Sequence, residues 1–78
     1  MISPQQIRGA RAMLGLTQAE LAERAGMSKT GLNNIESGAA DPKVSTLKAI
    51  QAALEAAGVE FIPENGGGPG VRLRKPQP

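Results

Sequence analysis

A short segment in the middle of the chain carries side chains suited to hydrogen bonding with the edges of DNA bases. In Lys29–Glu36, two apolar residues, Leu32 and Ile35, are spaced for one face of a helix. Lysine donates to guanine, asparagine pairs with adenine, and threonine offers a hydroxyl and a methyl group. The alternative interpretation is an ordinary solvated helix face. The other face carries four such side chains and no carboxylate: Lys29, Thr30, Asn33 and Asn34.

The side chains that most often carry catalysis or bind metals are missing. The 78 residues include no His, Cys, Tyr or Trp. The usual general base, the usual metal ligands and any disulfide are therefore absent. The seven acidic residues and the lysines form no paired constellation. We therefore expect no enzyme, no metal site and no cofactor, and a core this small is expected to hold no small-molecule ligand.

Charge and hydropathy are compatible with a nucleic-acid partner without requiring one. Nine Lys and Arg residues stand against seven Asp and Glu, for a net charge of +2 that many proteins share. The start of the chain lacks a basic segment followed by an apolar run, and no apolar stretch approaches the roughly 18 residues of a membrane span. A cytoplasmic protein with no membrane contact is expected.

Capping signals divide the first three quarters of the chain into short helices. Ser3 and Thr17 are each followed three residues later by Gln or Glu, as in a capping box, and Pro4 suits a first helical position. Gly31 lies inside the third helix, at a cost of about 1 kcal/mol relative to alanine. The expected N-caps are Ser3, Thr17, Ser28 and a residue near Ser45. The expected ends are Gly15, Gly26, Ser37–Gly38 and Gly58.

After Gly58 the spacing of the apolar residues changes from a helical pattern to the alternating pattern of a strand. Two alternating runs flank a Gly- and Pro-rich turn over residues 64–70, which predicts a β-hairpin. The turn lacks the Lys-Ser/Thr and following helix of a phosphate-binding loop. The expected fold is mainly α: a four- to five-helix, repressor-like helix-turn-helix domain (1–58), a C-terminal β-hairpin (59–75) and a flexible tail (76–78).

Two short helices joined by Gly26-Met27-Ser28 have the form of a helix-turn-helix. Residues 17–28, with the sequence TQAELAERAGMS, and residues 35–38, with the sequence IESG, resemble the Cro/C1-type (XRE) family of helix-turn-helix proteins. The resemblance extends over roughly Ile7 to Leu54. It implies binding to double-stranded DNA, with helix 29–36 reading the major groove.

The resemblance also assigns roles by position. Lys29, Thr30 and Asn34 match the base-contacting positions of the family, with Asn33 beside them. Gln18 matches a glutamine that clamps a phosphate, and helix N-termini favour anions for an independent reason. Arg11 and Glu36 match a structural ion pair that joins the first helix to the end of the recognition helix. The expected phosphate contacts are Thr17, Gln18, Ser28, Ser37, Gly38 and Lys43.

The hairpin predicts a homodimer, because a two-stranded hairpin is marginal in isolation and operators of this family usually have twofold symmetry. Packing of the hairpin on the last helix of its own chain is the competing account. Arg72, Arg74 and Lys75 either extend the DNA footprint or protect a strand edge, and we favour edge protection. The candidate dimer-interface residues are Val59, Phe61, Val71 and Leu73.

These observations predict a sequence-specific transcriptional regulator, acting as a repressor or autoregulator. The alternative is a protein-interaction module on the same fold, an antitoxin or adaptor that binds a small toxin through its fourth helix or its hairpin. A toxin encoded nearby, or a small protein that co-purifies, would distinguish the two.

Overall fold

The computed structural model describes residues 1–74, which form four helices and one β-hairpin. The elements are α1 (Pro4–Leu14), α2 (Gln18–Ala25), α3 (Lys29–Glu36), α4 (Val44–Ala56), β1 (Val59–Ile62) and β2 (Gly70–Leu73). The expected mainly α fold with a C-terminal hairpin is confirmed, and the number of helices among these residues is four. Lys75 and the expected tail 76–78 lie outside the described residues.

The first two helices begin and end where the capping residues predict. Ser3 caps α1 and Thr17 caps α2, each in a complete capping box that is closed by Gln6 or Glu20. Both helices end at a glycine in the left-handed conformation, with φ of 68° at Gly15 and 71° at Gly26. A side chain is strained in this conformation, so glycine allows the chain to turn sharply after each helix.

The fourth helix begins earlier than its cap signal predicts. The N-cap is Lys43, which makes no side-chain capping bond, and Ser45 lies inside the first turn of α4. The carbonyl of Lys43 already accepts from the backbone N–H of Leu47 at 3.1 Å, so the helical ladder starts there. The prediction of a cap near Ser45 is therefore wrong. Burial of Ile50 and Leu54 holds α4 in place without a side-chain cap.

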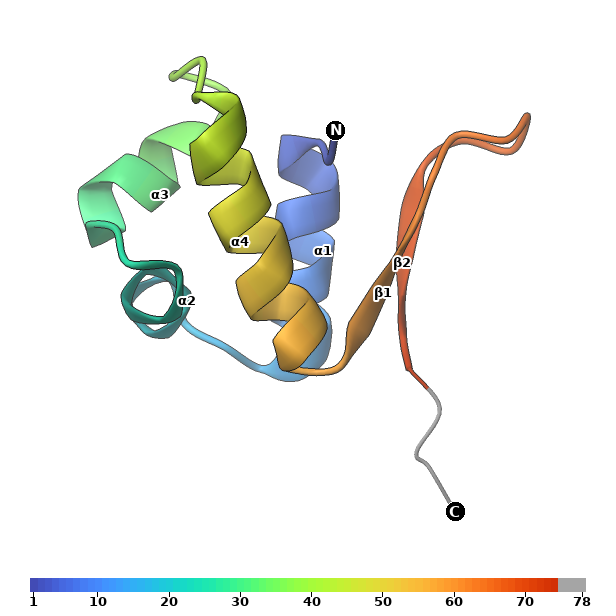
Figure 1. The fold of residues 1–78 in the computed structure, drawn as a ribbon, viewed down its shortest axis with the longest axis horizontal. Coiled ribbons are helices and arrows are strands. Elements are labelled where there is room, and N and C mark those ends of the chain that lie inside the picture. The colour runs from blue at the N-terminus through green and yellow to red at the C-terminus, as the bar shows by residue number, and fades with distance from the viewer. Residues whose placement is uncertain (75–78) are drawn as a thin grey trace.

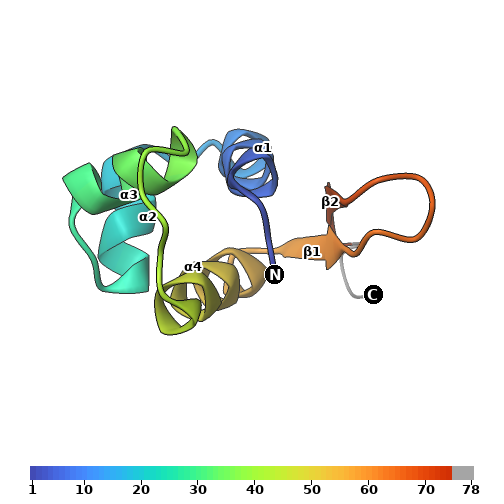
Figure 2. The same ribbon diagram turned by 90° about the horizontal axis from the view of Figure 1, so that it is seen from above.

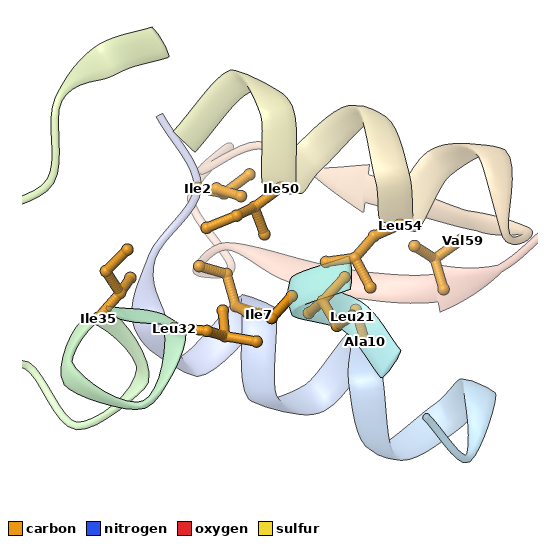
Figure 3. Close-up of a cluster of buried hydrophobic side chains, with 10 residues drawn as sticks. Ile2, Ile7, Ala10, Leu21, Leu32, Ile35, Ile50, Leu54 and Val59 are labelled. Atoms are coloured by element: carbon orange, nitrogen blue, oxygen red, sulfur yellow. The ribbon is translucent and has the colours of Figure 1, made fainter. Parts of the chain in front are cut away.

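Helices α1 and α4 occupy the middle of the molecule, with α2 and α3 on one side and the hairpin on the other (Figures 1 and 2). The buried side chains between these elements form a single apolar cluster (Figure 3). Burying such side chains is the main force that holds helices this short in place. The cluster comprises Ile2, Ile7, Ala10, Leu21, Ala22, Leu32, Ile35, Ile50, Leu54 and Val59.

The hairpin packs against its own chain, on both α1 and α4. Its antiparallel register pairs Val59 with Leu73 and Phe61 with Val71, which places these four apolar residues on one face. Val59 is completely buried within its own chain, so its side chain is covered without a second copy. Phe61 and Val71 pack partly against the core, whereas Leu73 is 54% exposed.

A buried glutamine holds the hairpin onto the first helix. The side-chain oxygen of Gln6 accepts from the backbone N–H of Ser3, as its capping role predicts. Its amide nitrogen donates to the carbonyl of Gly70 at 3.0 Å and to that of Ile62 at 3.4 Å. The same side chain therefore closes the N-terminus of α1 and ties it to the far end of the two-stranded ladder.

Candidate nucleic-acid interface

Helix α3 presents a polar face to solvent because its apolar residues are anchored in the core. Leu32 is completely buried and Ile35 is 4% exposed, which fixes the rotation of the helix about its axis. The hydroxyl of Ser28 caps the helix by accepting from the backbone N–H of Gly31 at 3.0 Å. The four side chains predicted to contact bases are all exposed: Lys29, Thr30, Asn33 and Asn34.

The end of α3 is joined to α1 by a charge pair. The Nε and Nη2 atoms of Arg11 donate to the two carboxylate oxygens of Glu36, both at 3.0 Å. The Glu36 side chain is only 3% exposed and that of Arg11 is 25% exposed. Arg11 also donates from Nη1 to the carbonyl of Leu16 at 3.1 Å. A bidentate arginine of this kind fixes both position and orientation.

A second arginine contacts the same end of α3. Arg8 donates from Nη1 to the backbone carbonyl of Glu36. The last carbonyls of a helix have no partner within the helix and carry partial negative charge, so a guanidinium is favourable there. This role of Arg8 was not predicted from the sequence. The one signal that points to it is that Arg8 lies one turn from Arg11.

Gln18, at the first position of α2, reaches across to α3. Its amide nitrogen donates to Oδ1 of Asn33 and to Oε1 of Glu36, both at 3.2 Å. The structure therefore brings together four residues: Arg11, Gln18, Asn33 and Glu36. From the sequence, Asn33 was predicted as a base contact, Gln18 as a phosphate contact, and Arg11 with Glu36 as a separate ion pair. The network connects the exposed polar face of α3 to the start of α2.

An open hollow of about 740 Å³ lies beside the N-terminus of α2. Within the described residues, the backbone N–H groups of Gln18 and Ala19 donate no hydrogen bond. Such groups at a helix N-terminus attract anions, and Lys29 adds a positive charge. The residues that line the hollow are Arg11, Gly15, Leu16, Thr17, Gln18, Ala19 and Lys29.

The carboxylate of Glu20 lies in the same first turn of α2. It accepts from the backbone N–H of Thr17 at 2.9 Å. This bond, with the side-chain bond to Thr17, holds the pKa of Glu20 below its ordinary value. Glu20 is thus ionised at neutral pH and occupied as the reciprocal half of the capping box.

The other expected phosphate contacts differ in the donors they offer. The hydroxyl of Ser28 accepts a capping bond, which leaves its O–H free to donate, whereas the hydroxyl of Thr17 also bonds the Glu20 carboxylate. The Ser37 hydroxyl instead donates to the carbonyl of Asn34 at 3.1 Å, and the N–H of Gly38 donates to that of Ile35. Lys43 is exposed at the start of α4. Ser37 and Gly38 therefore have no unengaged donor of this kind for a phosphate.

Outside this surface, the described residues offer few sites for other chemistry. Among residues 1–74, no group of three or more acidic side chains is arranged to hold a metal ion. No helix in the same range is long and apolar enough to cross a membrane. A second open hollow, of about 580 Å³, lies where Ile2, Gln6 and Phe61 meet, although the sequence had given no reason to expect a pocket.

Together, the fold and this surface define a helix-turn-helix domain. Residues 7–61 match the Helix-turn-helix family, and this is well over half of the chain, so the protein belongs to that family. The resemblance to Cro/C1-type helix-turn-helix proteins is confirmed.

Two known proteins illustrate the relationship. The chain is 42% identical over 50 residues to the immunity repressor protein of Bacillus phage phi105, an alignment that covers 64% of this chain and 35% of the repressor. The chain thus spans about a third of that relative's length. It also resembles the crystal structure of a mutant of the restriction-modification controller protein C.Esp1396I, with a TM-score of 0.64 and 27% identity over 67% of this chain and 68% of the other.

Proposed function

We propose that the protein is a sequence-specific double-stranded DNA-binding regulator of transcription, acting as a repressor or autoregulator, with α3 in the major groove. The observation that carries the proposal is an exposed, carboxylate-free helix face. The one carboxylate at the end of that helix, Glu36, is buried and paired with Arg11. The negatively charged major groove of DNA would therefore face hydrogen-bond donors and a lysine on α3, and no exposed carboxylate. This proposal is supported by the two relatives, since one is a phage immunity repressor and the other a restriction-modification controller protein.

Phosphate contacts are proposed on either side of α3. The unengaged N–H groups at the start of α2, the Ser28 hydroxyl and the Lys43 ammonium all offer donors there. Contacts of this kind position the protein on DNA without reading sequence. Ser37 and Gly38 are left out of the proposed interface, because their donors are engaged within the protein.

The experiment is selection from a random duplex-DNA pool at fixed salt, with the wild type and with Lys29, Thr30 and Asn34 all changed to alanine. We expect the wild type to enrich a motif that the triple variant does not. Lys48→Ala is the control, because it also removes one positive charge but from an exposed position of α4 that is not part of the proposed interface. If the wild type enriches no motif, direct reading by α3 is refuted. Partner capture would then test the antitoxin or adaptor alternative.

We also propose that two copies assemble through the hairpin, because an eight-residue helix alone offers few base contacts. The N–H of Arg74 bonds the carbonyl of Gly58, so the hydrogen-bonded pairs of the ladder are Glu60–Arg72 and Ile62–Gly70. The peptide groups of Val59 and Phe61 then point to one outer edge, and those of Val71 and Leu73 to the other.

The two edges of this hairpin are protected unequally. The guanidinium of Arg74 donates to the carbonyls of Glu55 and Val59, at 2.9 and 3.4 Å, and so covers part of the β1 edge. Arg74 thus has the edge-protecting contacts that the sequence analysis favoured. Within residues 1–74, no hydrogen bond joins the outer peptide groups of Val71 or Leu73. The β2 edge is therefore the one proposed to pair, antiparallel, with β2 of a second copy.

A further inference from the structure

The hydrogen-bond direction in the Gln18 network follows from the charge of Glu36. An ionised carboxylate only accepts hydrogen bonds, so the side chain of Gln18 must turn its NH₂ group toward Glu36. Arg11 keeps the carboxylate in place from the other side. The second hydrogen of the same NH₂ group points to Asn33, whose side chain must therefore turn its oxygen toward Gln18. The NH₂ group of Asn33 is left facing away from the network.

We propose that Gln18 is a positioning residue that fixes the amide of Asn33 as a hydrogen-bond donor, and so determines the base preference at the base pair that Asn33 contacts. This inference rests on the proposed function, because it concerns how α3 reads DNA. Asn33 is exposed on the same face as Lys29, whereas Gln18 is half-buried and acts through Asn33.

The fixed orientation favours a base that presents acceptors in the major groove. Guanine shows two acceptors there, N7 and O6, and both suit the outward NH₂ group of Asn33. The usual pairing of asparagine with adenine needs the side-chain oxygen as well, and Gln18 already occupies that oxygen. Cytosine presents a donor, which would face the NH₂ group of Asn33 donor to donor. We therefore expect guanine to be preferred by about tenfold at this base pair.

The same geometry changes the role expected for Gln18. Both hydrogens of its NH₂ group are used within the protein, at 3.2 Å each, so neither is left for a phosphate. The unengaged backbone N–H groups of Gln18 and Ala19 remain for that purpose. A side-chain phosphate clamp and a positioning residue predict different results when Gln18 is replaced.

The test combines duplex-DNA selection with affinity measurements at fixed salt for the full chain and for Gln18→Leu. If Gln18 positions Asn33, the variant loses the guanine preference at one base pair and keeps the rest of the motif. If Gln18 clamps a phosphate, the variant enriches the unchanged motif, guanine preference included, and binds all sequences more weakly by a similar factor, which overturns the inference but leaves the proposed function intact. Gln51→Leu is the matched control, because Gln51 also donates to a carboxylate, that of Glu55 on α4.

A second variant does not depend on the folding of Gln18→Leu. In Asn33→Asp, one carboxylate oxygen still accepts from Gln18 and the other presents an acceptor outward. We expect the preferred base at that pair to change from guanine to cytosine, which presents a donor. An unchanged preference in Asn33→Asp overturns the inference. If the wild type itself enriches no motif, the proposed function fails and this inference fails with it.

Discussion

The orientation of α3 depends on the Glu36 carboxylate, which is almost fully buried and bonded by both Arg11 and Gln18. A buried ion pair is not in itself strong evidence of net stabilisation, because both groups lose hydration. Removing one partner is different, since the other charge then stays buried without compensation. The pair therefore serves chiefly to hold α3 at one angle to α1.

Arg11→Ala is expected to lower the free energy of unfolding by about 2 kcal/mol, which is less than for a fully buried pair because the Arg11 side chain is a quarter exposed. Arg11→Ala and Glu36→Ala together should cost less than the sum of the two single changes. Chemical denaturation of the four members of this double-mutant cycle measures the coupling. Arg24→Ala, at an exposed position in α2, is the control and should cost less than about 1 kcal/mol. Strict additivity would show that the pair makes no energetic contribution.

Glu64 organises the turn of the hairpin through its carboxylate. Oε1 accepts from the backbone N–H groups of Gly68 and Gly66, at 2.9 and 2.8 Å, and these bonds hold the pKa of Glu64 below its ordinary value of 4.5. A lowered pKa means that the ionised carboxylate stabilises the folded turn above pH 4.5 and that this contribution is lost as pH falls through the lowered pKa.

We expect the amide resonances of Gly66 and Gly68 to titrate together below pH 4.5 in an NMR pH series, with the midpoint below that value. In Glu64→Gln the uncharged amide oxygen still accepts, so the same resonances should show no such titration. A midpoint at or above 4.5 would contradict the role given to these two bonds.

Some residue roles were within reach of sequence reasoning and others were not. Ser3, Thr17 and Ser28 act on groups three residues away, so their capping could be predicted from local spacing. Gln6 and Arg8 contact atoms 28 to 64 residues away along the chain. No local pattern indicates contacts over such distances, and only the packing of α1 against α3 and the hairpin creates them.

At the scale of the element, α3 contains a glycine whose conformation any residue could adopt. Its Cα lies close to the cap: a Cβ added at Gly31 would lie 3.1 Å from the Ser28 hydroxyl oxygen, and the cap would have to shift. From helix propensity alone, Gly31 is expected only to cost about 1 kcal/mol relative to alanine. The structure indicates that much of this cost is offset, because glycine leaves room for the capping hydroxyl.

We therefore expect Gly31→Ala to change the free energy of unfolding by less than about 0.5 kcal/mol, because the gain in helix propensity is offset by a displaced cap of similar value. In a Ser28→Ala background there is no hydroxyl to displace, and Gly31→Ala should stabilise by about 1 kcal/mol. Denaturation of both single variants and the double variant measures this difference. Equal stabilisation in the two backgrounds would show that the cap does not limit Gly31.

The elements themselves were predicted with one error in a helix start. Local capping chemistry determines where α1, α2 and α3 begin, and the spacing of buried residues determines their rotation. Helix α4 begins without a side-chain cap, so a prediction from capping residues placed its start near Ser45. Packing of Ile50 and Leu54 stabilises the helix instead, and the residues that they pack against cannot be identified from the neighbouring sequence.

At the scale of the whole molecule, α3 and the hairpin lie at opposite ends, separated by α1 and α4 (Figures 1 and 2). The sequence left open whether the hairpin packs on its own chain or pairs with a second copy. The structure shows the first, since one face rests on α1 and α4. Packing of that face does not prevent pairing through the β2 edge, because strands pair side by side through backbone groups.

Pairing of two β2 strands about a twofold axis at Arg72 would place Val71 of each copy opposite Leu73 of the other. Leu73 is 54% exposed in the single chain and would become covered. The two Arg72 side chains would become neighbours, and each already has a carboxylate, because Arg72 bonds Glu60 of its own chain at 2.8 Å. On the outer face of the resulting four-stranded sheet, the two Arg72 and two Glu60 side chains would therefore form a row with no net charge.

We expect light scattering to give the mass of a dimer for the wild type at tens of micromolar, and that of a monomer for Leu73→Pro, because proline removes an edge N–H that the second strand requires. Leu73→Thr keeps that N–H and the strand propensity, and is the matched control. The proline variant should bind one half-site as the wild type does but lose the added affinity for a palindrome. Monomeric wild type would refute assembly through this edge, whereas a dimer that survives Leu73→Pro would place the interface elsewhere on the molecule.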